Sequence, residues 1–341
     1  MTSNDPRKLG FYMPAEYYPH ERCWMAWPCR KSLWGDSLQE VKVAYARVAQ
    51  AIRQFEPLTM VVNPADVVEA KSLLGEGIEI VPLPIDDSWV RDSGPNFLLD
   101  GEGRLAGSTF RFTAWGDKFP EYTQDALLGG RILDHAGARN FVSGMVGEGG
   151  GITVDGEGTV ITTESCFLNT NRNPGWAKRE VENELCRLLG TQKVIWLPGD
   201  PDEKGTDGHV DGLAAFARAG VVLLEKAFDT GHPRYALLQE NYHALQGQTD
   251  ARGRPLDIVF IEDAWECELA DLNACVSYIN SYLANGGVVI PEYGLPADER
   301  VRRVYQRLYP DRKITPVRID PITLGGGGIH CITQQQPRST R

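Results

Sequence analysis

The sequence predicts an α/β fold in which residues 1–341 form one continuous domain. Short apolar segments typical of strands alternate with amphipathic segments typical of helices along the chain. No stretch rich in proline and serine, and no change of composition, divides the chain into parts. A chain of 341 residues is also long enough to bury a large core.

The elements are expected in the following order. Residues 1–36 contain many aromatic residues and prolines, and we expect an irregular segment whose rings mainly pack in the interior, with a pocket wall as the alternative. A helix is expected to begin at Ser37, because the apolar residues after it follow helical spacing: Leu38, Val41, Ala44, Tyr45, Val48, Ile52 and Phe55. Further helices are predicted at Asp66–Leu74, Trp176–Leu189, Arg234–Leu245 and Asp298–Tyr309. Strands are predicted at Leu58–Val62, Ile78–Leu83, Asn96–Leu99, Thr159–Thr163, Lys193–Leu197, Leu213–Ala217, Val221–Glu225, Asp257–Ile261, Val288–Pro291 and Thr315–Ile319.

Charge and cysteine content narrow the class of protein. The formal net charge of -11 argues against a nucleic-acid partner and slightly favours a small cationic ligand. The seven cysteines show no disulfide or metal-type spacing, which fits a reducing cytoplasm. Residues 1–14 lack the apolar core of a signal peptide, and no window is apolar enough for a membrane span. We therefore expect a cytoplasmic protein without a membrane partner; the sequence leaves room for a homo-oligomer.

The C-terminal stretch Gly325-Gly-Gly-Gly-Ile-His-Cys-Ile-Thr-Gln-Gln-Gln-Pro337 joins four glycines to a cysteine. Consecutive glycines weaken helices and strands, but they allow sharp turns and close approach of the backbone to other groups. Cys331 follows them, and a cysteine in such a turn is well placed to act as a nucleophile. A buried structural cysteine is the alternative interpretation.

A second polar stretch, Asp86-Asp-Ser-Trp-Val-Arg-Asp-Ser-Gly-Pro95, follows a predicted strand. Asp92 could pair with a cationic ligand, and Trp89 could face the stem of a long substrate. Alternatively, Arg91 binds a carboxylate and merely closes the loop.

Two more stretches carry ionisable residues among glycines. In Gly147-Glu-Gly-Gly-Gly151, Glu148 is either a turn charge or a carboxylate brought close to a partner. In Thr206-Asp-Gly-His-Val-Asp-Gly212, His209 and Asp211 alternate as on a strand, so we expect both side chains on one face. A histidine beside a carboxylate is suited to acid–base chemistry near neutral pH.

Other chemistries fit this set of residues less well. His209, Asp211 and His330 could bind zinc, but the sequence lacks the usual zinc-ligand spacing. A papain-like peptidase or amidase needs only one group to orient its histidine, which leaves several acids without a role. Three acids with a thiol and a histidine better suit a cationic substrate that is attacked at carbon.

The four motifs together resemble those of the agmatine deiminases, which belong to the guanidine-modifying pentein superfamily. Trp89-Val-Arg-Asp-Ser-Gly-Pro95, Glu148-Gly-Gly, Gly208-His-Val-Asp211 and the C-terminal stretch carry the resemblance. The segment Thr162–Pro174 is also similar, and the likeness extends from about residue 14 to residue 337. It implies a five-bladed, pseudo-symmetric α/β propeller and hydrolysis of agmatine to N-carbamoylputrescine and ammonia without a cofactor.

The resemblance also implies a role for each matching residue. Cys331 would be the nucleophile and His209 the general acid and base. Asp92 and Asp211 would hold the guanidinium nitrogens of the substrate. Glu148 would orient His209 and face the substrate with it, and Trp89 would line the channel for the aliphatic stem.

Two positions depart from the family pattern. Gly205 replaces an acidic residue expected four positions before the histidine, so that Asp202 or Glu203 would have to read the far amine of agmatine. Gly328 replaces a common asparagine; we expect a minor effect on loop rigidity, with loss of a polar contact near the thiol as the alternative. Another guanidine, such as free or peptidyl arginine or a guanidino acid, is therefore an alternative substrate, and a non-catalytic binder of cations is an alternative function.

Overall fold

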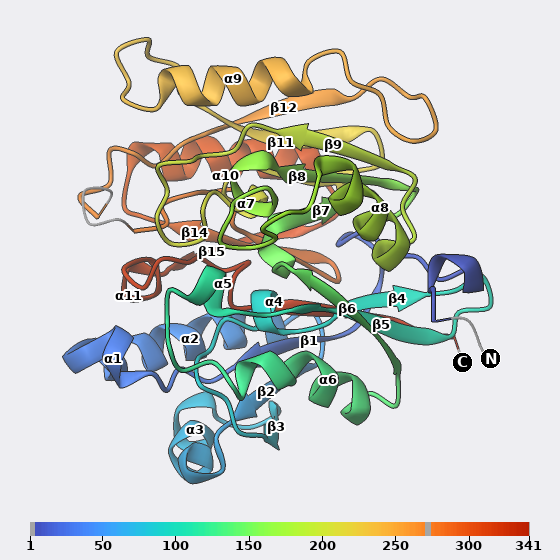
Figure 1. The fold of residues 1–341 in the computed structure, drawn as a ribbon. Coiled ribbons are helices and arrows are strands. Elements are labelled where there is room, and N and C mark those ends of the chain that lie inside the picture. Colours follow the sequence, from blue (N-terminus) through green and yellow to red (C-terminus); the bar gives the residue numbers. More distant parts are fainter. Residues whose placement is uncertain (1–3, 270–273, 341) are drawn as a thin grey trace.

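One hydrogen-bonding pattern recurs in the five sheets of the computed structural model, which describes residues 4–269 and 274–340. Each sheet begins with an antiparallel pair of strands and continues with a parallel pair (Figure 1). In spatial order the sheets are β16 (Gln334–Pro337), β1 (His20–Ala26), β2 (Leu58–Val62) and β3 (Glu79–Pro82); β4 (Asn96–Leu99), β5 (Leu105–Arg111) and β6 (Arg139–Val146); β7 (Ile152–Val154), β8 (Thr159–Thr163) and β9 (Lys193–Leu197); β10 (Ala214–Arg218), β11 (Val221–Lys226) and β12 (Asp257–Glu262); and β13 (Tyr282–Ala284), β14 (Gly287–Glu292) and β15 (Lys313–Arg318).

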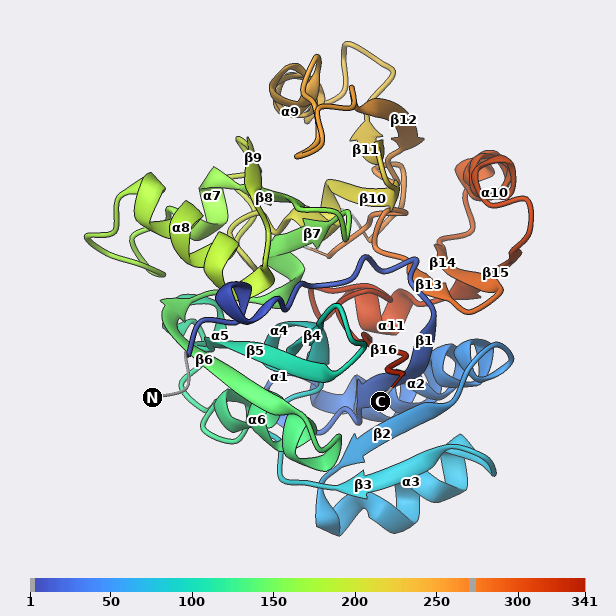
Figure 2. The same cartoon turned by 90° about the vertical axis from the view of Figure 1, so that its right-hand side faces the viewer.

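A helical crossover joins the strands of each parallel pair, as parallel pairing requires. The crossover helices are α2 (Leu38–Arg53), α3 (Val67–Leu74), α6 (Asp125–His135), α8 (Lys178–Leu189), α9 (Tyr235–Leu245) and α10 (Pro296–Leu308). The shorter helices are α1 (Lys31–Trp34), α4 (Val90–Ser93), α5 (Ala114–Asp117), α7 (Glu164–Phe167) and α11 (Asp320–Thr323), with 3-10 turns η1 (Arg7–Leu9), η2 (Gly35–Ser37), η3 (Pro64–Asp66), η4 (Gly149–Gly151) and η5 (Val210–Gly212). Figure 2 shows α3, α6, α8, α9 and α10 at the rim, whereas α4 and α11 lie nearer the middle. The predicted α/β class and the five-bladed, pseudo-symmetric propeller are confirmed.

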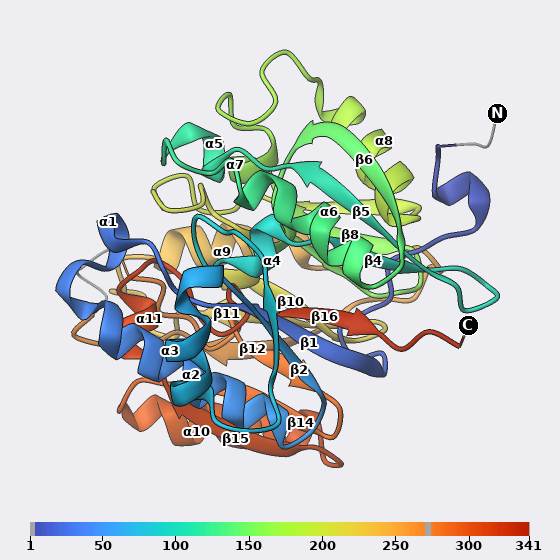
Figure 3. The ribbon, with the colours of Figure 1, turned by 90° about the horizontal axis from the view of Figure 1, so that it is seen from below.

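The ring is closed by the end of the chain. Figure 3 shows β16 beside β1. The two strands pair antiparallel, with Gln335 opposite Cys23 and Gln334 opposite Trp24. The buried side chain of Gln336 accepts a hydrogen bond from Trp24 Nε1 at 2.9 Å. This strand also carries the chain away from the stretch that contains Cys331.

The predicted helices and strands are present, with shifts of a few residues at their ends. The apolar stripe of α2 is buried as expected, except that Phe55 lies beyond the end of the helix and is only partly buried. Strand β1 lies within residues 1–36, which we expected to be irregular. The elements α6, β5, β6, β13 and β16 were not among those predicted from the sequence.

The expected strand at His209 and Asp211 is wrong. Asp207 and Gly208 have φ angles of 63° and 82°, and a left-handed turn of this kind interrupts a strand. Asp211 lies instead in the 3-10 turn η5, which His209 precedes. Within the part of the chain that the structure describes, no helix combines the length and the apolar character needed to cross a bilayer.

Candidate active site

The four-glycine stretch before Cys331 allows unusually close packing. A Cβ atom at Gly327 would lie 2.2 Å from the Trp89 ring, and one at Gly325 would lie 2.0 Å from the Trp34 ring. These glycines are therefore used for close approach, and only Gly326 among them has a positive φ angle, of 93°. The loop leads into a buried turn that contains Cys331.

Three of the predicted site residues surround Gly150 in η4. A Cβ atom at Gly150 would lie 2.6 Å from His209 Nδ1, 2.8 Å from Asp92 Oδ1 and 3.0 Å from Asp211 Oδ2. Only glycine leaves room for these three side chains to converge. The glycine turn after Glu148 thus serves to bring polar groups from three segments to one point.

Cys331 lies beside Asp211, one of the three residues around Gly150. Its Sγ is 3.6 Å from Asp211 Oδ2, and its carbonyl oxygen accepts a hydrogen bond from the Arg91 N–H at 3.2 Å. A hydrogen bond with Cys275, burial and the negative charge of Asp211 raise the pKa of the Cys331 thiol well above its usual value. In the free protein this sulfur is therefore a protonated thiol beside a carboxylate.

Asp92 is held by two donors. Its Oδ1 accepts a hydrogen bond from Gly150 N at 2.9 Å, and its Oδ2 accepts one from Trp115 Nε1 at 2.9 Å. Burial raises the pKa of Asp92, whereas the charge of His209 opposes this rise. Instead of closing its own loop on a carboxylate, the Arg91 guanidinium faces Glu16, at 3.7 Å, and the Gln335 side chain, at 2.8 Å.

His209 lies between two carboxylates. Its Nδ1 is 3.7 Å from Asp92 Oδ1, and its Nε2 is 3.3 Å from Glu148 Oε2. Burial favours the neutral ring, but the charge of Asp92 and the hydrogen bond with Glu148 raise the pKa of His209 well above its usual value. His209 therefore begins as an imidazolium that can donate a proton.

Glu148 is fixed by an arginine. Arg172 Nε lies 2.9 Å from Oε1 and 3.1 Å from Oε2 of Glu148, and neither side chain is exposed to solvent. Burial disfavours the ionised acid, but the charge of Arg172 holds the pKa of Glu148 below its usual range. Glu148 is thus a carboxylate at neutral pH and can keep His209 charged.

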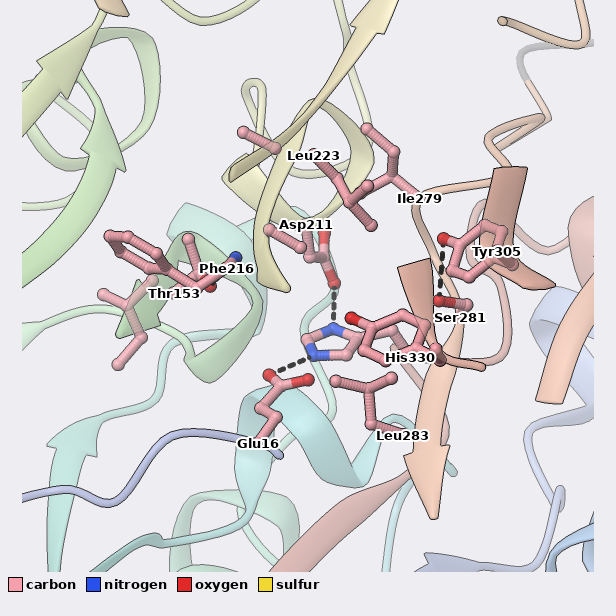
Figure 4. A pocket seen from close by; sticks show the side chains of 14 residues that line it. Glu16, Thr153, Asp211, Phe216, Leu223, Ile279, Ser281, Leu283, Tyr305 and His330 are labelled. Atoms are coloured by element: carbon pink, nitrogen blue, oxygen red, sulfur yellow. Dashed lines mark hydrogen bonds and ion pairs between the residues drawn. The ribbon is translucent and has the colours of Figure 1, made fainter. Parts of the chain in front are cut away.

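His330 links Asp211 to the N-terminal segment (Figure 4). Its Nδ1 lies 2.8 Å from Asp211 Oδ2, and its Nε2 lies 2.7 Å from Glu16 Oε1. Burial and Arg91 lower the pKa of His330, yet the two carboxylates raise it above its usual value overall. Burial alone would raise the pKa of Asp211, but His330 lowers this pKa below its usual value and keeps the acid ionised.

A cavity adjoins this group of residues. Figure 4 shows Asp211, His330 and Glu16 at its wall, together with Ser281 and Tyr305. Cys331, Asp92 and His209 do not line it. It therefore shares Asp211 with the candidate site, whereas the other converging groups lie outside its wall.

Trp89 is buried against the nucleophile loop. Its ring centroid is 5.6 Å from that of Trp34, and the ring contacts Gly327. Two indole rings thus lie beside the four-glycine stretch, next to the site. This position is suited to contact with an apolar stem, but the proposed role of Trp89 remains a prediction.

The zinc ligands considered from the sequence do not form one set. His330 binds Asp211, whereas His209 faces Asp92 and Glu148. Among the described residues, Glu148, Cys166 and His209 bring possible ligand atoms within 4.8 Å of one another. The Arg172 guanidinium already contacts both oxygens of Glu148, so a metal cation there would meet a fixed positive charge.

The loop before His209 does not present Glu203 as a ligand group. Its carboxylate accepts hydrogen bonds from the backbone N–H groups of Thr206, at 2.8 Å, and Gly208, at 3.1 Å, and from the Thr206 hydroxyl, at 2.6 Å. Glu203 therefore orders the loop. Asp207, which the sequence did not single out, lies 2.9 Å from Lys118 Nζ and 2.7 Å from Arg172 Nη1.

Sequence reasoning missed several residues that support the site. Arg172 lies in the family-like segment 162–174, but nothing in its neighbours predicted its pairing with Glu148. Trp115 and Glu16 gave no signal, because their partners are distant in the sequence. His330 stood beside the nucleophile and was considered only as a metal ligand.

Comparison with known proteins finds similarity over nearly the whole chain. The family model of the Porphyromonas-type peptidyl-arginine deiminases matches residues 12–337. The agmatine deiminase of Stutzerimonas stutzeri is 39% identical over 360 residues, which cover 98% of each chain, and that of Medicago truncatula is 38% identical over 370 residues, again 98% of each. The solved structure of the Enterococcus faecalis agmatine deiminase matches with a TM-score of 0.93 at 34% identity, over 99% of each chain.

Proposed function

The chain belongs to the Porphyromonas-type peptidyl-arginine deiminase family, and from this premise we propose that it is an agmatine deiminase. It hydrolyses the guanidino group of agmatine to N-carbamoylputrescine and ammonia through an intermediate on a cysteine. The residues that perform each step are our assignment: Cys331, His209, Glu148, Asp92 and Asp211.

Two aspartates and an imidazolium converge at Gly150, and the Cys331 thiol lies 3.6 Å from one of these aspartates, Asp211; this arrangement carries the proposal. A guanidinium is planar and always charged near neutral pH, and its N–H groups match carboxylate oxygens. Burial of this cation is costly unless it is paired, and Asp92 and Asp211 can supply the pairing. Two acids on either side would also hold the central carbon in front of Cys331 Sγ.

The first half-reaction forms a covalent intermediate. The positive charge of the substrate offsets the charges of Asp92 and Asp211, which hold the proton on the Cys331 sulfur. Binding thus favours loss of the thiol proton to solvent, and the resulting thiolate attacks the guanidinium carbon and gives a tetrahedral adduct. His209 donates its proton to the departing nitrogen, ammonia leaves, and a thiouronium remains on Cys331.

The second half-reaction uses the same groups in the opposite direction. Once it has lost its proton, His209 accepts a proton from water, and the hydroxide attacks the thiouronium carbon. Collapse of this second adduct breaks the carbon–sulfur bond and releases the ureido product. The hydroxyl proton of the adduct passes to the departing sulfur, which becomes a thiol again. His209 keeps the proton taken from water, and Glu148, held by Arg172, stabilises this imidazolium for the next cycle.

The substrate is a small guanidino compound, and Trp89 is assigned to its aliphatic stem. We retain the predictions that the chain forms one catalytic domain, acts in the cytoplasm without a cofactor and leaves room for a homo-oligomer.

The test is a substrate panel. Ammonia and ureido product are measured with agmatine, free arginine, a peptidyl arginine and a guanidino acid, and we expect the highest kcat/KM with agmatine. A higher kcat/KM with another guanidine would change the proposed substrate but leave the proposed reaction unchanged. Absence of turnover with all four would overturn the proposal.

A further inference from the structure

Asn280 lies beside the nucleophile and has no role in the reaction described above. It precedes β13, and none of its surface is exposed. Its backbone is fixed by a short turn, because Ser281 N donates to the Ile279 carbonyl at 2.6 Å across it. A buried amide needs partners for both its oxygen and its nitrogen, so its surroundings determine its orientation.

The amide oxygen faces two backbone donors. Asn280 Oδ1 accepts a hydrogen bond from His330 N at 2.9 Å and a longer one from Cys331 N at 3.4 Å. The reverse orientation would place an NH₂ group against these two N–H groups, where no hydrogen bond could form. With the oxygen fixed in this way, the nitrogen is the amide atom nearer to Cys331 Sγ, at 3.3 Å against 3.6 Å for Oδ1.

The amide nitrogen points at the sulfur. Asn280 Nδ2 is 3.3 Å from Cys331 Sγ and 3.5 Å from the carbonyl oxygen of Asp211. The thiol proton can point to Asp211 Oδ2, 3.6 Å from Sγ, which leaves the sulfur lone pairs free to accept from Asn280. A hydrogen bond to a charged acceptor is stronger than one to a neutral acceptor, so this donor favours the thiolate over the thiol.

Gly328 makes room for this amide. A Cβ atom at position 328 would lie 2.5 Å from Asn280 Oδ1 and 2.9 Å from its Cγ. Any side chain there would displace the amide from the His330 and Cys331 N–H groups. The sequence left open that glycine at this position removes a polar contact near the thiol; Asn280, which precedes β13, makes such a contact.

We propose that Asn280 is a catalytic residue whose side-chain N–H donates a hydrogen bond to Cys331 Sγ and holds the thiolate against the substrate carbon. This inference rests on the proposed function for its role in turnover, but the hydrogen bond itself does not. Three neighbouring groups oppose the thiolate: the carboxylates of Asp211 and Asp92 and the thiol of Cys275. The side-chain N–H of Asn280 favours the thiolate and so opposes the effect of these three groups.

Two variants test the proposal through the reactivity of the sulfur. Asn280→Ala removes the donor without adding charge, and Asn280→Asp keeps an oxygen for the His330 N–H but removes the donor. Alkylation of Cys331 by iodoacetamide, followed by mass spectrometry over a range of pH, reports the thiolate fraction. We expect alkylation at neutral pH to slow by about tenfold in Asn280→Ala, and kcat/KM for agmatine to fall by at least the same factor.

Asn241 provides a matched control. It is also fully buried, and its amide binds only backbone groups: its oxygen accepts from Gly199 N at 2.9 Å, and its nitrogen donates to the carbonyls of Gly199 and Leu237. Asn241→Ala should lower the melting temperature but leave the pH profile of alkylation unchanged. A purely structural role of Asn280 would give this same pattern.

The outcomes separate the two proposals. An alkylation profile and kcat/KM within twofold of wild type in both folded Asn280 variants would overturn the inference and leave the deiminase function intact. Failure of the wild type to release ammonia from any guanidine would overturn the function, while the alkylation profile would still test the hydrogen bond. If neither variant folds, a crystal structure of the wild-type protein decides: an Asn280 amide nitrogen turned away from Sγ would refute the proposal.

Discussion

Replacement of Trp115 by phenylalanine should impair turnover by removing one hydrogen bond from Asp92. Trp115 Nε1 donates to Asp92 Oδ2 at 2.9 Å, and both residues are buried. The backbone at Ala114 and Trp115 has φ angles of 50° and 58°, a conformation that costs energy for residues other than glycine. This strain is maintained in a segment that directs the indole N–H at a carboxylate of the site.

The magnitude follows from the chemistry of the bond. A hydrogen bond to a charged group contributes about 1.5–3 kcal/mol, which corresponds to about a 10- to 150-fold loss of kcat/KM if the whole effect is felt in the transition state. The Trp115 hydrogen bond lowers the pKa of Asp92, so its removal raises this pKa. Asp92 then needs a higher pH to ionise, and the acid limb of the kcat/KM profile should move to higher pH.

The assay is ammonia release from agmatine over a range of pH, with Trp27→Phe as the control. Trp27 is fully buried, but its Nε1 has no hydrogen-bond partner among the described residues, so the same change of side chain removes no hydrogen bond there. We expect Trp27→Phe to lower stability and leave the pH profile unchanged. An identical profile and kcat/KM in folded Trp115→Phe and wild type would refute the reasoning.

Three further predictions concern single groups. Cys331→Ser should abolish turnover but still bind agmatine in calorimetry, and measurable steady-state activity would remove Cys331 as the nucleophile. Asp92→Asn should lower kcat/KM at least about 30-fold, mainly through binding and positioning of the guanidinium, because the cation loses a charged partner; an unchanged kcat/KM would exclude Asp92 from the site. Burial alone would raise the pKa of Glu16, but His330 and Arg91 lower this pKa from 4.5 to about 2. The stability that Glu16 contributes is therefore present above pH 4.5 and is lost as the pH falls toward 2. The loss is about 3 kcal/mol, and chemical denaturation should show a smaller loss on acidification in Glu16→Gln; equal acid sensitivity of the two proteins would contradict this assignment.

Local patterns predicted the parts of the fold that follow one periodicity. Helix α2 and the strands β2, β4, β8 and β9 agree with apolar patterns that the sequence shows directly. Helix α6 escaped prediction because Gly129 and Gly130 interrupt it, and glycine is a poor helix former. A Cβ atom at Gly129 would lie 2.8 Å from Thr109 Cγ2, so tertiary packing decides this position.

Strand β16 shows more clearly that tertiary contacts, and not local sequence preference, form some of the elements. Strand β16 consists of three glutamines and a proline, which no strand propensity favours, yet all four are buried. Contacts from other parts of the ring compensate: Arg91 binds Gln335, and Trp24 binds Gln336. Each of these contacts joins residues more than 200 positions apart, so no local pattern could have indicated them.

The residues of the candidate site also fall into two groups, those that a local pattern predicted and those that it did not. The residues proposed to meet the substrate lie in motifs rich in glycine and charge, and the structure brings Cys331, His209, Asp92, Asp211 and Glu148 together. For the residues that hold these groups in place, such as Trp115 and Arg172, no local pattern indicated the partner. Their partners depend on how the blades are arranged around the ring.

The position of β16 has a consequence for synthesis of the protein. The strand that completes the ring follows Cys331 almost directly, whereas the acids, the imidazole and Trp89 belong to segments that leave the ribosome earlier. A growing chain can therefore assemble an anionic pocket before it possesses a reactive sulfur. Completion of the catalytic site therefore coincides with docking of the last strand.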